Sequence, residues 1–130
     1  MEKIEKTEAE WKTVLSPRVY EITRRAGTER PFTGEYYNHK DPGTYDCACC
    51  GLPLYRSTEK FNAHCGWPSF WDGAVKGNIV EKPDDSLGMR RVEINCARCD
   101  AHLGHIFEDG PKPTGMRHCV NSASLVFRKD

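Results

Sequence analysis

The chain has 130 residues, the size of one domain, and its 19 Lys and Arg balance its 19 Asp and Glu to zero formal net charge. Nucleic-acid-binding domains usually need a basic surface, so the balance argues against that class. No apolar run reaches the ~18 residues of a membrane span, and residues 1–10 lack the apolar stretch of a secretory signal. We therefore predict one cytoplasmic, monomeric domain over residues 1–130 that binds neither nucleic acid nor membrane.

The N-terminal part, residues 1–27, predicts two short helices. Thr7 and Glu10 have the spacing of a capping box, in which each side chain bonds the other residue's backbone amide. Ser16 and Pro17 are the residue types preferred just before and at the first helical position. Gly27 is typical of a helix end. We expect helices at roughly 7–15 and 17–26, followed by a β-rich core over residues 28–130.

After Gly27 the sequence is rich in glycine, proline and short β-type runs. Between Pro53 and Gly88 the pattern predicts loops and short strands, and Asp109–Gly115 (DGPKPTG) predicts a turn before the last strand. This order predicts an α+β fold, mainly antiparallel, with two small sheets and the helices segregated at the N-terminus. The candidate strands are residues 34–38, 43–47, 54–57, 89–95, 102–107 and 117–127.

Seven cysteines are many for a chain of this size, and the odd count argues against a secreted disulfide scaffold. Four of them form two CxxC pairs, Cys47/Cys50 and Cys96/Cys99, each followed by a turn residue. Two such pairs can place four thiolates tetrahedrally around one Zn²⁺ and leave no position for a substrate. A structural zinc clamp is therefore predicted. The alternatives are two disulfides or four cysteines buried as small apolar side chains.

Three cysteines remain: Cys49, Cys65 and Cys119. If residues 117–121 form a strand, Arg117, Cys119 and Asn121 share one face. Arginine would then favour a Cys119 thiolate, which is the reactive form. Cys65, next to Gly66, suits an accessible second thiol able to form a disulfide with an oxidised partner. Simple core packing explains either cysteine equally well at this stage, and Cys49 has no assigned role.

His102 and His105 lie just after the second CxxC pair. In a regular strand these two positions face opposite sides, but a bulge at Gly104 would bring both imidazoles to one side. Paired histidines there would serve as acids near neutral pH. Turn-capping and surface roles remain alternatives for them. Trp67 is either a core anchor or an apolar wall for a methyl or thioether group.

Taken together, these strings resemble the B-type methionine sulfoxide reductase family. The resemblance runs from Gly27 to Phe127, about three quarters of the chain. It is carried by GTERPFTG at 27–34, CACCG at 47–51, GWPSF at 66–70, AHLGH at 101–105, DGPKPTG at 109–115 and RHCVNSAS at 117–124. It implies reduction of the R epimer of methionine sulfoxide, free or in proteins, with thioredoxin as the external reductant.

The resemblance also implies roles for individual residues. Cys119 would be the nucleophile, Cys65 the recycling cysteine and Trp67 the residue that holds the substrate methyl group. The implied polar groups of the active site are His102, His105, Asn121 and, more weakly, Asp109, and the implied zinc ligands are Cys47, Cys50, Cys96 and Cys99. Two positions depart from the family pattern: His118 stands where Tyr or Phe is common, and His64 where small residues are common.

Two other functions compete with this one. A non-catalytic zinc module would explain the two CxxC pairs, but it leaves two spare thiols and two histidines without a role. A disulfide reductase would need a free CxxC redox pair, and both pairs here are assigned to metal. A single-turnover sulfoxide assay separates the reductase from the first rival, and native alkylation of the cysteines separates it from the second.

Overall fold

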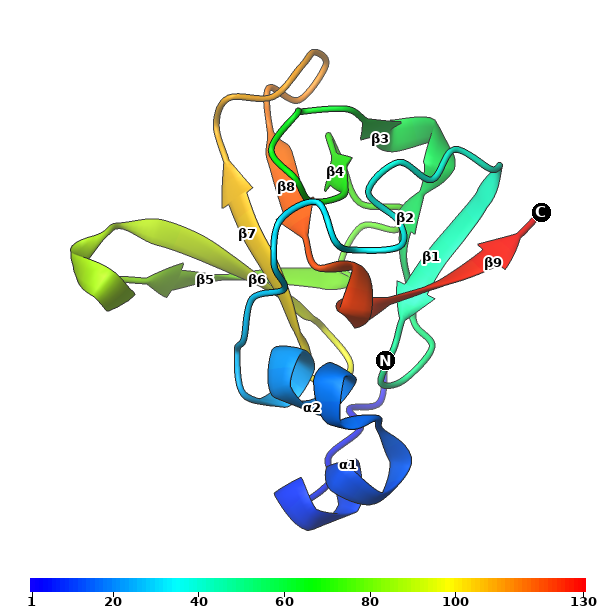
Figure 1. Cartoon of the computed structure of the whole chain (residues 1–130), viewed down its shortest axis with the longest axis vertical. Coiled ribbons are helices and arrows are strands. Elements are labelled where there is room, and N and C mark those ends of the chain that lie inside the picture. The colour runs from blue at the N-terminus through cyan, green and yellow to red at the C-terminus, as the bar shows by residue number, and fades with distance from the viewer.

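The computed structural model describes the backbone of residues 1–130 and every side chain except that of Leu87. Two helices, α1 (Glu8–Val14) and α2 (Pro17–Arg24), precede the strands (Figure 1). The strands are β1 (Gly43–Cys47), β2 (Pro53–Arg56), β3 (Lys60–Phe61), β4 (Ser69–Phe70), β5 (Ile79–Asp84), β6 (Arg91–Cys96), β7 (His102–Phe107), β8 (Arg117–Val120) and β9 (Leu125–Lys129). None of the described helices has the length and apolar character needed to cross a bilayer.

Both helices begin as the sequence predicts. The Thr7 amide donates to the Glu10 carboxylate at 2.9 Å and the Glu10 amide donates to the Thr7 hydroxyl at 3.2 Å, which is the capping box. Ser16 accepts from the amide of Val19, with Pro17 in the first turn. The second helix ends at Arg24, two residues before the predicted end. The chain leaves the helix there because Ala26 already has a left-handed φ of 54°.

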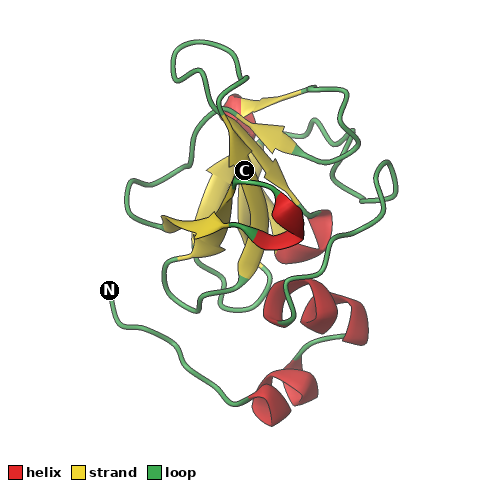
Figure 2. Ribbon diagram, turned by 90° about the vertical axis from the view of Figure 1, so that its left-hand side faces the viewer, coloured by secondary structure: helices red, strands yellow, loops and turns green.

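The strands form two antiparallel sheets, as the sequence predicts. One has the order β2-β1-β9 and the other the order β3-β4-β8-β7-β6-β5, and every pairing is antiparallel. The second sheet is larger than the expected small sheet because β3, β4 and β5 join it. Figure 1 shows β5 and β6 as a two-stranded arm, and Figure 2 shows the helices gathered at one end of the strands.

Two strand predictions are wrong. Residues 34–38 form turns, because the amide of Tyr37 bonds to Gly34 and that of His39 to Tyr36 instead of to a neighbouring strand. The predicted long strand 117–127 is broken after Val120 by a short 3-10 turn at Ser122–Ser124. The strand after this break pairs with β1, so one continuous β-type sequence supplies both sheets.

The six-residue strand β5 lies in the region 53–88, where the sequence predicts loops and short strands. Ile79–Asp84 pairs along its whole length with β6, although it contains Pro83. It is one of the two edge strands of the sheet, and proline is tolerated on edge strands, where one side of the backbone needs no partner.

The core lies between the sheets and fixes the orientation of β8. Tyr55 and Phe70 are fully buried and stack with ring centroids 4.3 Å apart, and Val120 and Leu103 are fully buried as well. Val120 and His118 face the core. Because side chains alternate along a strand, Arg117 and Cys119 point to the opposite side of β8.

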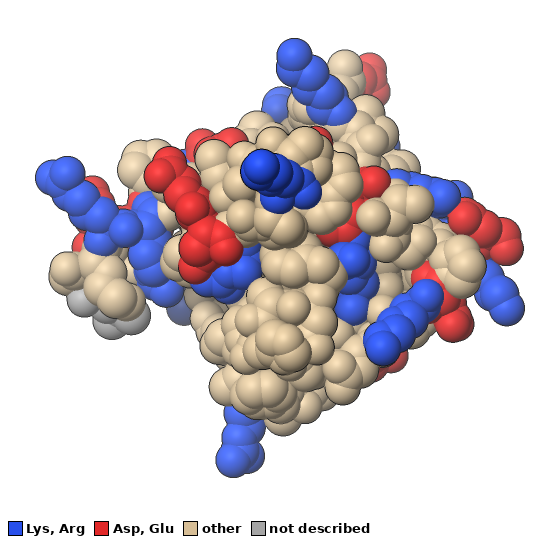
Figure 3. All heavy atoms as spheres, turned by 90° about the horizontal axis from the view of Figure 1, so that it is seen from above, with Lys and Arg blue, Asp and Glu red and all other residues tan. Residues whose placement is uncertain are grey.

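Charged groups of both signs are scattered over the face of the molecule seen from above (Figure 3).

Candidate active site and metal centre

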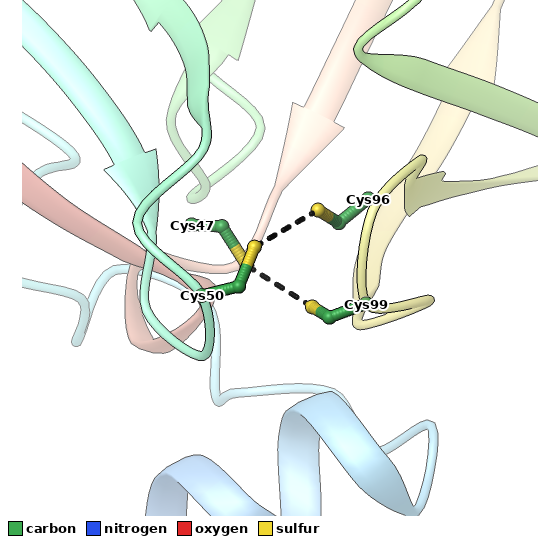
Figure 4. Close-up of side chains that lie close together, drawn as sticks. All are labelled: Cys47, Cys50, Cys96 and Cys99. Atoms are coloured by element: carbon green, nitrogen blue, oxygen red, sulfur yellow. Dashed lines mark hydrogen bonds between the residues drawn. The ribbon is translucent and has the colours of Figure 1, made fainter. Parts of the chain in front are cut away.

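The two CxxC pairs meet although 45 residues separate them. Cys47 and Cys96 are the last residues of β1 and β6, and Cys50 and Cys99 lie in the turns that follow these strands (Figure 4). The two turns are built alike. In one the amide of Gly51 bonds to the carbonyl of Cys47 at 2.8 Å, and in the other the amide of Asp100 bonds to the carbonyl of Cys96 at 2.9 Å.

Both turns close with a left-handed residue, Gly51 at φ 79° and Asp100 at φ 65°. Glycine adopts this conformation without strain, and aspartate is among the residues that tolerate it best. This backbone geometry lets both cysteines of each turn direct their sulfur atoms toward the other turn (Figure 4).

The four sulfur atoms fit a metal ion. The Cys47 and Cys99 sulfurs lie 3.6 Å apart, as do those of Cys50 and Cys96, and all four lie within 4.8 Å of one another. Tetrahedral coordination with Zn–S bonds of about 2.3 Å requires sulfur atoms ~3.8 Å apart. All seven cysteines are free thiols in the structure, and 3.6 Å far exceeds the ~2.05 Å of a disulfide bond. The four cysteines therefore form a possible metal-binding site.

A separate cavity of about 230 Å³ opens beside β7 and β8. Clefts for drug-sized ligands measure roughly 300–1,000 Å³, so this one suits a single side chain. It brings together most of the residues singled out from the sequence, while Asp109 is not among those that line it. Its lining residues are Thr28, Cys65, Trp67, Arg91, His102, Gly104, His105, Phe107, Arg117, Cys119 and Asn121.

Cys65 and Cys119 lie side by side in the wall of the cavity, with their sulfur atoms 3.9 Å apart. The pairing of β4 with β8 sets Ser69 opposite Cys119, and this brings the preceding loop with Cys65 alongside. The hydrogen bond between the sulfurs lowers the pKa of Cys65 to about 5 and raises the pKa of Cys119, which burial raises further. The two thiols therefore titrate as a coupled pair, in which one proton can lie on either sulfur.

His102 and His105 lie on the same side of β7, with ring centroids 5.6 Å apart. The register explains this: His102 pairs with Asn95 and Gly104 with Ile94, so β7 carries one extra residue between them. The bulge expected near Gly104 is present. The register also sets His105 directly across from Cys119 on β8.

Each histidine is paired with a carboxylate. His102 Nδ1 lies 2.6 Å from Glu93 Oε2, and His105 Nε2 lies 2.7 Å from Asp84 Oδ2. Since an ionised carboxylate only accepts, these ring nitrogens carry the hydrogen, which leaves His102 Nε2 and His105 Nδ1 free. Burial lowers the pKa of His102, against the opposing effect of Glu93. The histidine bond also helps hold the pKa of Asp84 well below its ordinary value, after a larger contribution from Ser86.

Trp67 and Asn121 are both held by the backbone of one residue, Glu29. The Trp67 indole N–H donates to the carbonyl of Glu29, and the amide of Glu29 donates to Asn121 Oδ1, each at 3.0 Å. The side-chain amide of Asn121 donates in turn to the carbonyl of Leu103 at 3.1 Å. These bonds place both side chains on the cavity in a single orientation.

Arg117 and Asp109 form an ion pair at the rim. Arg117 donates from Nε at 2.8 Å and from Nη2 at 3.2 Å to the two carboxylate oxygens of Asp109. Asp109 is 64% exposed, whereas Arg117 packs over Phe107 and its charge acts to lower the pKa of Cys119. Asp109 thus orients Arg117 rather than reaching the cavity itself.

Of the two departures from the family pattern, His118 faces away from Cys119. His118 is buried on the opposite face of β8, where Nδ1 lies 2.9 Å from the Tyr55 hydroxyl, and burial lowers its pKa to about 4. His64 is exposed and adopts a left-handed φ of 57° next to Cys65.

Sequence reasoning missed several residues at this site. Asp84 and Glu93 lie on the arm formed by β5 and β6, and their partners are 21 and 9 residues away along the chain. Thr28, Arg91 and Phe107 also line the cavity. Glu93 gave a signal in principle, since it is an acidic residue in the otherwise strand-like run Arg91–Cys96. Nothing local marks Asp84 as a histidine partner.

Two close thiols and two histidine–carboxylate pairs around one small cavity are the groups of a thiol-dependent oxidoreductase, and the four-cysteine cluster adds a possible metal-binding site. Residues 15–129 match the SelR domain.

Curated relatives are similar over nearly the whole chain. The protein of Variovorax paradoxus is 57% identical over 131 residues, which covers 97% of this chain and 96% of the relative. That of Hahella chejuensis is 56% identical over 127 residues, covering 98% and 91%. That of Acinetobacter baylyi is 56% identical over 130 residues, covering 100% and 94%. Each carries the name peptide methionine sulfoxide reductase MsrB, and this chain belongs to that family.

Proposed function

We propose that this chain reduces methionine-R-sulfoxide, in proteins and as the free amino acid, to methionine, with Cys119 as the nucleophile and Cys65 as the recycling thiol. The observation that carries the proposal is the 3.9 Å approach of these two sulfur atoms in a cavity lined by both histidines. A cavity of about 230 Å³ with Trp67 and Phe107 in its wall suits the methyl and thioether end of one side chain.

The first step requires the Cys119 thiolate. Transfer of the shared proton from Cys119 to Cys65 moves the negative charge of the pair to Cys119, where Arg117 stabilises it. The thiolate attacks the sulfoxide sulfur and forms a bond between the Cys119 sulfur and the substrate sulfur, while the sulfoxide oxygen takes up a proton. The protonated oxygen then moves to the Cys119 sulfur as its bond to the substrate sulfur and the bond between the two sulfurs break. The substrate is reduced by two electrons to methionine, and Cys119 is oxidised to a sulfenic acid.

The sulfoxide oxygen must take up a proton during this step. His105 is the better-placed donor, because it lies directly across from Cys119 in the strand register and its side chain is 14% exposed, against 5% for His102. Asp84 holds the His105 ring in one orientation, as carboxylates do for catalytic histidines. Asn121 supplies a further hydrogen bond to the oxygen.

The second step closes the cycle. The Cys65 thiol, which holds the proton taken from Cys119, attacks the sulfenic sulfur and gives that proton to the leaving oxygen. A Cys65–Cys119 disulfide forms as the S–O bond of the sulfenic acid breaks, and the oxygen leaves as water. The sulfur atoms must approach by about 1.9 Å for a bond of ~2.05 Å. We propose thioredoxin as the dithiol that reduces the disulfide.

The four-cysteine cluster is proposed to hold one structural Zn²⁺. Four thiolates are the donor set that zinc prefers, and zinc there would tie β1 to β6 across the two sheets. Cys49 lies beside the cluster without belonging to it. We further propose that the chain acts as a monomeric, cytoplasmic enzyme of one domain, residues 1–130, with a helical segment at 1–27 and the catalytic core at 28–130.

The proposal is tested on separate epimers with a thioredoxin couple. The wild-type chain should turn over the R epimer, Cys119→Ser should release no methionine, and Cys65→Ser should release about one methionine per chain and then stop. Cys49→Ser is the matched control, and its recycling should equal that of the wild type. Turnover by Cys119→Ser, or full thioredoxin recycling by Cys65→Ser, would contradict the assigned roles.

A further inference from the structure

Glu29 is a buried acidic residue that the proposed reaction does not use. Its side chain has no solvent exposure. Its Oε2 accepts from the amide of Ser122 at 2.9 Å and its Oε1 from the amide of Ala123 at 3.1 Å. The sole cation near this carboxylate among the described side chains is Arg18, whose Nη2 lies 3.5 Å from Oε1 on a side chain that is 57% exposed. A carboxylate removed from water is costly, so a specific use for it is expected.

The backbone of the same residue holds two cavity side chains. The amide of Glu29 donates to Asn121 Oδ1, and its carbonyl accepts the indole N–H of Trp67. Three segments distant in sequence therefore meet at Glu29: its own loop, the loop that carries Trp67 and the turn after β8. The carboxylate ties the first of these to the third, directly after Asn121.

This arrangement limits what Asn121 can offer a substrate. Its Oδ1 is taken by Glu29, and one hydrogen of Nδ2 is taken by the carbonyl of Leu103. A carboxamide has two N–H donors, so one hydrogen is left, and Asn121 lines the cavity. The amide cannot flip without setting its nitrogen against the Glu29 amide. The free Nδ2 hydrogen is therefore the donor that Asn121 has left to offer a substrate.

We propose that Glu29 is a positioning residue for sulfoxide reduction, which holds Asn121 so that its remaining N–H points at the sulfoxide oxygen while Trp67 holds the methyl side. This inference rests on the proposed function. A sulfoxide sulfur is pyramidal, with an oxygen, a methyl group and the substrate chain around it. If the Asn121 N–H that binds the oxygen is fixed relative to Trp67, which contacts the methyl group, only one epimer fits. Glu29 therefore affects the preference for the R epimer as well as the rate.

Space around the carboxylate leaves little room for adjustment. A Cβ built on Gly34 would lie 2.4 Å from Glu29 Oε2 and 2.2 Å from Ser122 Oγ. The backbone of Gly34 thus packs directly against the Glu29 carboxylate. If the Glu29 side chain were shortened or rotated, the turn after β8 could follow it only by displacing the loop that contains Gly34. Glu29→Gln is the informative change, because it preserves the shape but sets an NH₂ group against one of the two backbone amides.

The test measures kcat/KM on the two epimers. Glu29→Gln should lower kcat/KM for the R epimer by about 10- to 100-fold and reduce the ratio of R to S rates, since misplacement by ~1 Å can cost about 100-fold. Arg18→Met, which removes the neighbouring cation alone, should stay within about two-fold of the wild type. Alkylation of Cys119 by iodoacetamide should keep its wild-type rate in both variants.

A double-mutant cycle separates positioning from general loosening of the fold. In the Asn121→Ala background, Glu29→Gln should lower kcat/KM by less than about three-fold, because its route to the substrate oxygen is already lost. The Asn121 side-chain amide and Trp67 indole NMR signals should both shift in Glu29→Gln. If that variant does not fold, Glu29→Asp, which keeps the charge but falls short of the two amides, takes its place in the cycle.

Three results would overturn the inference: a wild-type kcat/KM in Glu29→Gln, losses that multiply fully in the double variant, or unshifted Asn121 and Trp67 signals. Failure of the proposed function looks different, because the wild-type chain would then reduce neither epimer while the NMR signals would still report whether Glu29 holds the two side chains.

Discussion

Gly104 lies against the backbone of Cys119. This close contact affects both the geometry of the active site and the stability of the sheet. It pairs with Ile94 of β6 and with Val120 of β8, in the middle of the six-stranded sheet. A Cβ at this position would lie 1.9 Å from the carbonyl oxygen of Cys119. Since carbon and oxygen normally approach to about 3.3 Å, Gly104→Ala must separate the two strands by ~1.4 Å. That displacement lies along the path from His105 to Cys119.

The magnitude follows from the overlap. Overpacking of this kind costs about 1–3 kcal/mol of the free energy of unfolding, and a chain of this length loses about 3–4 °C of Tm per kcal/mol. We expect Tm to fall by about 7 °C and kcat for the R epimer to fall by about 100-fold, because the reacting groups move apart by ~1 Å.

Scanning calorimetry and single-turnover kinetics check this expectation. Gly77→Ala is the control, because Gly77 has a left-handed φ of 91° and no atom within 4 Å of an added Cβ. It should cost about 1 kcal/mol through backbone strain and leave kcat unchanged. A Gly104→Ala protein with the melting temperature and kcat of the wild type would refute the argument that this close approach sets the distance between β7 and β8.

Three further predictions follow from individual contacts. Burial lowers the folded-state pKa of His118 to about 4 from 6.5, so the unfolded chain takes up this proton at a higher pH than the folded chain. The free energy of unfolding therefore falls as pH drops through this range, by up to ~3 kcal/mol. Urea titrations at about pH 7 and pH 4.5 should show a smaller fall for His118→Phe than for the wild type, and an equal fall would contradict the prediction. If the four-cysteine cluster holds zinc as proposed, Cys96→Ser should lose the metal and have a lower Tm, whereas Cys49→Ser should keep about one zinc per chain. Metal analysis of the two variants checks this, and equal zinc contents would show that Cys96 is not a ligand. Glu93→Gln should lower the pKa of the His102 imidazole further, because it removes the interaction that raises it. NMR titration of the His102 ring checks this, and an unchanged pKa would contradict the role given to Glu93.

The parts of this protein that the sequence determined are those held by neighbouring residues. The capping box needs contacts three residues apart, and the CxxC turns need contacts four residues apart. Alternation along a strand placed Arg117, Cys119 and Asn121 on one face, and all three line the cavity. Each of these features is closed by local backbone geometry, so the residue types involved leave a readable pattern.

The tertiary structure decided everything that depends on strand register. The 3.9 Å approach of Cys65 to Cys119 follows from pairing β4 with β8, and the bulge in β7 sets His105 across from Cys119. Residues 34–38 and 117–127 have the composition of strands, yet the first forms turns and the second is split between two sheets.

The carboxylate partners of the two histidines also come only from the fold, because β5 and β6 must pair with each other and with β7 before Asp84 and Glu93 reach the imidazoles. Packing and long-range pairing outweigh local preference at all these positions, since burying the core contributes more than the propensity of any five-residue run. The residue types of the site are therefore legible in the sequence, and the distances that make them reactive belong to the tertiary structure.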